Sequence, residues 1–97
     1  MTTTTTTTTT TALTFKRTDY YHQGNKMSIN GFDASGKCVG WIEALYHYKS
    51  SRLDRLVVRL YATGEEREIK ASVWGARKAV TVAKAVLETM HEKHLAA

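Results

Sequence analysis

The spacing of apolar residues changes at Gly75, and this change constrains the fold more than any other feature of the sequence. Before Gly75, apolar and polar residues alternate with the period of two that is typical of strands with one buried face. After Gly75, apolar residues recur with the 3.6-residue period of an amphipathic helix. The helical set is Ala76, Ala79, Val80, Ala83, Val86, Leu87 and Met90.

Turn residues divide the region before Gly75 into five expected strands, over residues 13–22, 26–32, 38–48, 53–62 and 67–74. Between them lie three predicted turns, at 23–25, 33–37 and 63–66, in which glycine and asparagine tolerate a positive φ. A polar connection is expected at 49–51.

These patterns predict an α+β fold: an antiparallel sheet of four to five consecutive strands (a meander), with one C-terminal amphipathic helix packed on one face. The apolar sheet side under the helix is expected to contain Leu56, Val58, Leu60, Ile69, Ala71 and Val73. We expect residues 13–97 to form this single domain. Residues 1–12 are expected to be a disordered threonine-rich tail, because the run from Thr2 to Thr11 buries no apolar surface.

The composition narrows the function classes. The chain has 97 residues, of which 42% are hydrophobic and 24% charged, as in an ordinary globular domain. No apolar run reaches the ~18–20 residues that span a bilayer, and no leader opens the chain, so a cytoplasmic protein without a membrane partner is expected. A single cysteine excludes an internal disulfide framework. The net charge of +5 favours an anionic partner.

One helix covers only one side of a sheet, and the other side is predicted to mix cations with aromatic rings. Such a surface suits single-stranded DNA or RNA, because bases stack on the rings and cations neutralise phosphates. We therefore predict a non-enzymatic nucleic-acid-binding module. The stacking residues are expected to be Trp41, Tyr61 and Trp74, and the phosphate contacts Lys16, Arg55, Arg59 and Lys70.

The same surface also fits two other interpretations. Aromatic residues and arginine concentrate in protein interfaces, so the face could serve a small inhibitor or modulator of a partner protein, of the kind that phages and mobile elements encode. A solvated face with no specific role is the third interpretation. A homodimer is expected in either binding role, because edge strands and a half-covered sheet favour pairing. A face interrupted by Glu43, Asp54 and Glu68 would favour a protein partner.

The order of elements over residues 26–91 resembles that of single-stranded-DNA-binding families such as the Whirly proteins and the transcriptional positive cofactors, which place four antiparallel strands before a helix. The resemblance is one of element order alone, and it implies no particular site residue. The additional strand expected at 13–22 departs from that pattern.

Three signals of other chemistry were weighed. Residues 31–38 nearly match a phosphate-binding loop, but Cys38 lacks the required hydroxyl and a strand is expected to follow instead of a helix. His91 and His94 could bind a metal together with Glu88 or Glu92, but a zinc site needs about four ligands, and Cys38 and His22 are not at a supporting spacing. An enzyme would need a deep pocket lined by His22, Cys38 and His47. We therefore predict no catalytic site, cofactor or metal.

Overall fold

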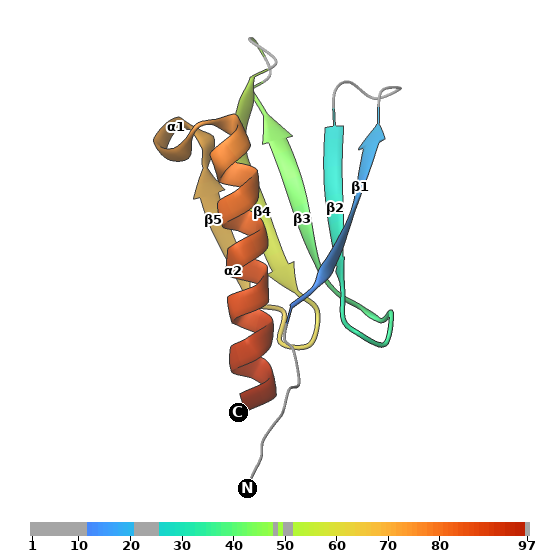
Figure 1. Ribbon diagram of the computed structural model, residues 1–97. Coiled ribbons are helices and arrows are strands. Elements are labelled where there is room, and N and C mark those ends of the chain that lie inside the picture. Colours follow the sequence, from blue (N-terminus) through green and yellow to red (C-terminus); the bar gives the residue numbers. More distant parts are fainter. Residues whose placement is uncertain (1–11, 21–25, 48, 50–51, 97) are drawn as a thin grey trace, which may run out of the picture.

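The computed structural model describes residues 12–20, 26–47, 49 and 52–96 and places five strands and two helices among them (Figure 1). Each strand pairs with the next one in sequence, so the sheet is an antiparallel meander in the order β1-β2-β3-β4-β5. The expected α+β fold is thereby confirmed. The elements are β1 (Thr14–Tyr20), β2 (Lys26–Phe32), β3 (Cys38–Tyr46), β4 (Leu53–Leu60), β5 (Glu66–Lys70), α1 (Ala71–Trp74) and α2 (Ala76–Ala96).

The turn between β2 and β3 is held by the carboxylate of Asp33. Its Oδ1 accepts hydrogen bonds from the Ser35 hydroxyl (2.6 Å), the Ser35 backbone N–H (3.0 Å) and the Lys37 backbone N–H (3.0 Å). Gly36 completes the turn with a φ of 87°, which residues with a Cβ rarely adopt. The predicted turn at 33–37 is confirmed. Because β3 follows it directly, residues 31–38 do not lead into the helix that a phosphate-binding loop requires.

Helix α2 covers one face of the sheet, lying mainly against β4 with β3 and β5 on either side (Figure 1). Small residues on its buried side, Ala79 and Ala83, allow a close approach. The sheet contributes two glycines to the same contact. A Cβ added at Gly40 would lie 2.4 Å from Leu87 Cδ1, and one at Gly31 would lie 2.9 Å from Leu87 Cδ2. Leu87 is fully buried because these two positions carry no side chain.

The remaining core residues come from the strands and from the last turns of α2. The predicted alternation is confirmed at every expected core position of β4 and at Ile69 and Ala71. The hydrophobic core cluster consists of Met27, Ile29, Ile42, Ala44, Leu56, Val58, Leu60, Ile69, Ala71, Ala79, Ala83, Leu87 and Met90.

The N-terminal strand is attached to the helix. Leu13 and Phe15 pack against the core cluster, and the Leu13 backbone N–H donates a hydrogen bond to Glu88 Oε2 (2.9 Å). The Lys84 ammonium lies 5.5 Å from the centre of the Phe15 ring. These contacts bring the start of β1 to the C-terminal half of α2, although the two segments are far apart in sequence.

The prediction that the fifth strand extends from 67 to 74 is wrong. β5 ends at Lys70, and residues 71–74 form the short helix α1. Pairing with β4 stops at Arg55 opposite Lys70, and the adjoining residue of β4, Asp54, is the extra residue of a register shift against β3. Gly75, with a φ of 81°, ends α1. As a result Val73, an expected core residue, is 71% exposed.

Smaller differences occur at other element ends. β3 ends at Tyr46 and β4 at Leu60, each two residues before the predicted end. Ala76 is exposed although it was placed in the apolar stripe, and His91 is buried beside the core. Residues 1–11 of the predicted tail, His22, the turn at 23–25 and part of the connection at 49–51 lie outside the described residues.

Candidate interaction surface

The sheet side chains that point away from α2 form a surface that we call the open face. Gly31 and Gly40 face Leu87, so their neighbours Asn30 and Trp41 point the other way. The strand register extends this assignment across the sheet. The open face carries Lys16, Thr18, Ser28, Asn30, Trp41, Glu43, Leu45, Arg55, Val57, Arg59, Glu66, Glu68 and Lys70.

Five of the seven residues predicted from the sequence to bind nucleic acid lie on the open face. Lys16, Trp41 and Arg59 belong to one row across the sheet, in which Asn30 stands between Lys16 and Trp41. Arg55 and Lys70 are paired opposite each other on β4 and β5. The sheet therefore brings together the cations that the sequence scatters over more than fifty positions, but only one of the three predicted aromatic residues.

Tyr61 lies just beyond the end of β4, beside the open face. It is half-exposed, and its backbone N–H donates to the Val39 carbonyl oxygen (3.0 Å). Partial burial, together with the nearby thiol of Cys38, raises the pKa of the Tyr61 hydroxyl above its ordinary value. The phenol is therefore a neutral hydrogen-bonding group at physiological pH.

Trp74 lies on α1 and does not belong to the open face. The sequence prediction placed it there by extending β5 through residue 74, and the early end of β5 removes it. Trp74 is 43% exposed, and the Lys78 ammonium lies 5.8 Å from the centre of its ring. Trp74 and Lys78 thus form a separate basic-aromatic pair at the junction of the two helices.

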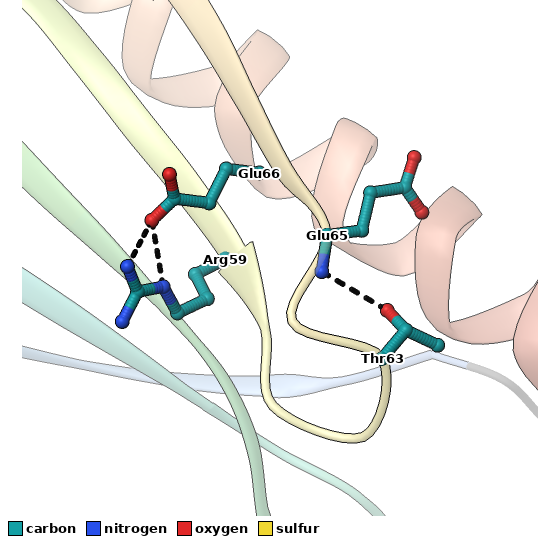
Figure 2. Close-up of polar contacts among 4 residues, drawn as sticks. All are labelled: Arg59, Thr63, Glu65 and Glu66. Atoms are coloured by element: carbon teal, nitrogen blue, oxygen red, sulfur yellow. Dashed lines mark hydrogen bonds and ion pairs between the residues drawn. The ribbon is translucent and has the colours of Figure 1, made fainter.

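The arginines of the open face are held in ion pairs by Glu66 and Glu68 of the same surface and by Asp54, which lies next to Arg55 in the sequence. Arg59 Nε donates to Glu66 Oε2 at 2.7 Å, and a second guanidinium nitrogen contacts the same oxygen (Figure 2). Arg55 contacts Asp54 (2.6 Å) and Glu68 (3.2 Å). Exposed pairs of this kind add little to stability, about 0–1 kcal/mol each. Their larger effect is to neutralise the positive charge that a phosphate group would meet.

The sequence prediction did not include the acidic residue Glu66 of β5 in this surface. Glu66 was assigned to the preceding turn, although it shares the alternation of Glu68 and Lys70 and so follows the same face. The alternation of Glu66 with Glu68 and Lys70 is the sequence signal that could have placed Glu66 on this face. Figure 2 shows the consequence, with the Glu66 side chain directed to Arg59 and the neighbouring Glu65 side chain directed toward α2.

Apolar atoms occupy the middle of the open face. Trp41, Leu45 and Val57 are half-buried there, and Glu43 lies opposite Val57 in the strand pairing. The open face therefore has a partly apolar centre surrounded by charged side chains of both signs. Lys16 on β1 and Lys70 on β5 are the cations near its edges.

The groups weighed for other chemistry stand apart from one another. Cys38 is half-buried, and its Sγ lies 3.5 Å from the Gly40 carbonyl oxygen and 4.0 Å from Asn30 Oδ1. His47 is exposed beyond the end of β3. Among the described residues, no three His, Cys, Asp or Glu side chains are grouped closely enough to hold a metal ion.

Comparison of the chain with known protein families, with curated proteins and with solved structures gives no match. Within the described part of the chain, neither helix has the length and apolar character needed to cross a membrane.

Proposed function

We propose that the protein is a non-enzymatic binding module whose open face recognises another protein. The observation that supports this proposal most directly is the pairing of Arg55 with Glu68 and of Arg59 with Glu66, both carboxylates of the same face. The carboxylates of Glu66 and Glu68 beside these guanidinium groups would repel phosphates, whereas a protein partner can offer charges of both signs. Here the acidic residues interrupt the positive charge, which is the condition that favours a protein partner.

The apolar centre of the open face supports the same conclusion. Interfaces between proteins commonly combine a partly apolar core, rich in aromatic residues and arginine, with a charged rim. Trp41, Leu45 and Val57 supply such a core, and the Arg–Glu pairs supply the rim. A partner with complementary charges would exchange these surface ion pairs for intermolecular ones at low cost.

Single-stranded nucleic acid is the second candidate ligand. The row of Lys16, Trp41 and Arg59 favours it, because a base stacked on the indole would have a cation on each side for its flanking phosphates. The net charge of +5 also favours a polyanion. This candidate requires the arginines to leave their carboxylate partners.

A second copy of the chain is the first protein partner to test. The open face carries side chains of both charges that a second copy could complement, and β1 is an edge strand, so a homodimer remains our expectation. We also infer a cytoplasmic location, in keeping with a single free cysteine on a domain without disulfides.

Two single-tryptophan variants separate these possibilities, because Trp41 and Trp74 are the chain's two tryptophans. The Trp74→Ala variant retains Trp41 as a fluorescent reporter on the open face, and Trp41→Ala retains Trp74 on α1. Capture experiments from the source cells should recover the same protein partner with the wild type and with Trp74→Ala, and lose it with Trp41→Ala. Sedimentation of the three proteins over a concentration range tests the homodimer in the same way.

To test nucleic-acid binding, a thymidine oligonucleotide is titrated into the Trp74→Ala variant at several salt concentrations, and Trp41 fluorescence reports binding. If all four cations of the open face contacted phosphates, the logarithm of affinity would fall against the logarithm of salt with a slope of about −2.8; if both arginines stayed paired, the slope would be about −1.4. Tight binding with the steeper slope, lost in Trp41→Ala, would replace the protein-partner proposal by the second candidate. Recovery of the same partner by Trp41→Ala would contradict the role of the open face altogether.

A further inference from the structure

A groove lies between the edge strand β5 and one side of α2. On the helix it is lined by the stripe Val82, Ala85, Val86, Thr89, Met90 and Lys93, and on the strand by Glu65 and Arg67. Its volume is about 290 Å³, and most of its lining is apolar. The stripe is rotated away from the fully buried side of α2, so its two valines are only half-buried. This groove is separate from the open face, which lies on the other side of the sheet.

The backbone of β5 is available for pairing along this groove. The Leu60 backbone N–H donates to the Glu65 carbonyl oxygen (3.0 Å), which sets the phase of the β4–β5 ladder. Hydrogen-bonded and non-hydrogen-bonded pairs alternate in an antiparallel ladder, so Arg67 and Ile69 bond to β4. The N–H and C=O groups of Glu66 and Glu68 then point outward, where the described sheet has no further strand.

We propose that this edge binds an extended peptide segment of a partner protein, added antiparallel to β5. Main-chain hydrogen bonds to Glu66 and Glu68 would hold it, as in other cases of strand addition to an exposed sheet edge. Side chains opposite Arg67 and Ile69 point to the α2 side and enter the groove. The segment therefore carries large apolar residues at two alternating positions.

The lengths of β5 and of the helical stripe on α2 both match a short extended peptide. The helical stripe from Val82 to Lys93 runs for about 16 Å, which is the span of about five residues of an extended chain. β5 itself has five residues. The two elements run in opposite directions, so the C-terminal turns of α2 lie beside the start of β5 (Figure 1).

The charges of the groove identify one further feature of the segment. Arg67 Nε donates to Glu65 Oε2 (2.9 Å), so these two residues neutralise each other. Lys93 has no acidic partner among the described residues and lies at the C-terminal end of the helical stripe that lines the groove. A carboxylate on the bound segment would complement it there. In an antiparallel segment this acidic residue follows the second apolar residue by two positions.

Strand spacing argues against a second copy of the chain as the occupant. Pairing β5 with the β5 of another copy would put the two β4 strands three spacings apart, about 14 Å. Because α2 lies mainly on β4, the two helices would be separated by a similar distance. Packed helices approach to about 8–10 Å, and valine and alanine are too small to fill the difference. A single added strand with large side chains fills this space.

The test uses the full ¹⁵N-labelled chain and the blocked peptide acetyl-Thr-Leu-Thr-Leu-Thr-Glu-amide as the probe. At a peptide concentration nine times the Kd, amide hydrogen exchange at Glu66 and Glu68 should slow about tenfold, because exchange then occurs only from the free fraction. The amides of Arg67 and Ile69, already bonded to β4, should change much less. Failure of these two outward amides to gain protection at saturating peptide would overturn the proposal.

Charge-swap variants test the position of the carboxylate. Lys93→Glu should weaken binding of the glutamate-ending probe at least tenfold and should restore binding of the same peptide ending in lysine. The matched control is Arg77→Glu, an exposed substitution of the same charge at the other end of α2, which should bind both peptides as the wild type does. Equal effects of the two variants would refute the assignment of Lys93.

Two other outcomes would also reject the peptide. Protection of Glu66 and Glu68 that rises with protein concentration, without any probe, would assign the edge to a second copy. Shifts confined to Trp41 and its neighbours would place the probe on the open face, which would support that face and reject the groove. The two proposals therefore fail separately.

Discussion

Replacing Gly40 by alanine tests the placement of α2, on which the definition of the open face depends. The added methyl group would lie 2.4 Å from Leu87 Cδ1 and 2.7 Å from the Arg59 carbonyl oxygen. Leu87 can change its rotamer, although it is packed in the core. The Arg59 carbonyl belongs to the β4 backbone opposite Trp41, so it moves only if the strands shift.

Two opposing contributions set the change in the free energy of unfolding for Gly40→Ala. Overpacking a core costs about 1–3 kcal/mol. Alanine in place of glycine returns about 0.4–1 kcal/mol by restricting the unfolded chain, where the native conformation allows it. Since the backbone contact relaxes poorly, we expect the free energy of unfolding to fall by about 2 kcal/mol. For a domain of this size the Tm would drop by about 8–16 °C.

Urea unfolding followed by far-ultraviolet circular dichroism measures this loss, and Gly31→Ala is the matched control. A Cβ at Gly31 would meet only side-chain atoms, the nearest being Leu87 Cδ2 at 2.9 Å, so a smaller loss is expected. Shortening Leu87 to valine in the Gly40→Ala background should recover only part of the loss, because the Arg59 carbonyl remains. A Gly40→Ala protein as stable as the wild type would refute the close approach of α2 to β3.

Three further substitutions test other parts of the structure. Gly75→Ala should lower the free energy of unfolding by about 1–3 kcal/mol, because φ is 81° and ψ 156° there, and thermal unfolding measures it. Asp33→Asn should be less stable than the wild type at neutral pH. The Ser35 hydroxyl and the Lys37 N–H hold the pKa of Asp33 below 3.8, so its contribution is present above that value and is lost as the pH falls through the lower folded-state pKa. Urea midpoints of the two proteins should therefore converge in acid, and a constant difference would contradict this. Glu88→Ala should speed amide exchange at Leu13 and cost about 1 kcal/mol, leaving exchange in β4 unchanged; equal acceleration in both strands would mean that the Leu13–Glu88 bond does not anchor β1 locally.

Much of the fold could be predicted from local sequence. The alternation of Leu56, Val58 and Leu60 and the turn at 33–37 specify strands and hairpin within a few residues, because side-chain period and turn chemistry act locally. The helical period after Gly75 likewise predicts α2 and the face that it covers. These patterns alone predicted the two layers of the fold. They also predicted which residues lie on the sheet face away from α2: Lys16, Trp41, Arg55, Arg59 and Lys70.

The tertiary structure decided where pairing stops and which charges meet. β5 ends at Lys70, where its pairing with β4 stops at Arg55, and this early end moves Trp74 off the open face. Arg59 meets Glu66 only through the β4–β5 register, and this contact sets a carboxylate among the cations of the open face. The sequence alone determined the periods of the elements. Register and edge geometry, which depend on contacts between distant segments, determined the surface.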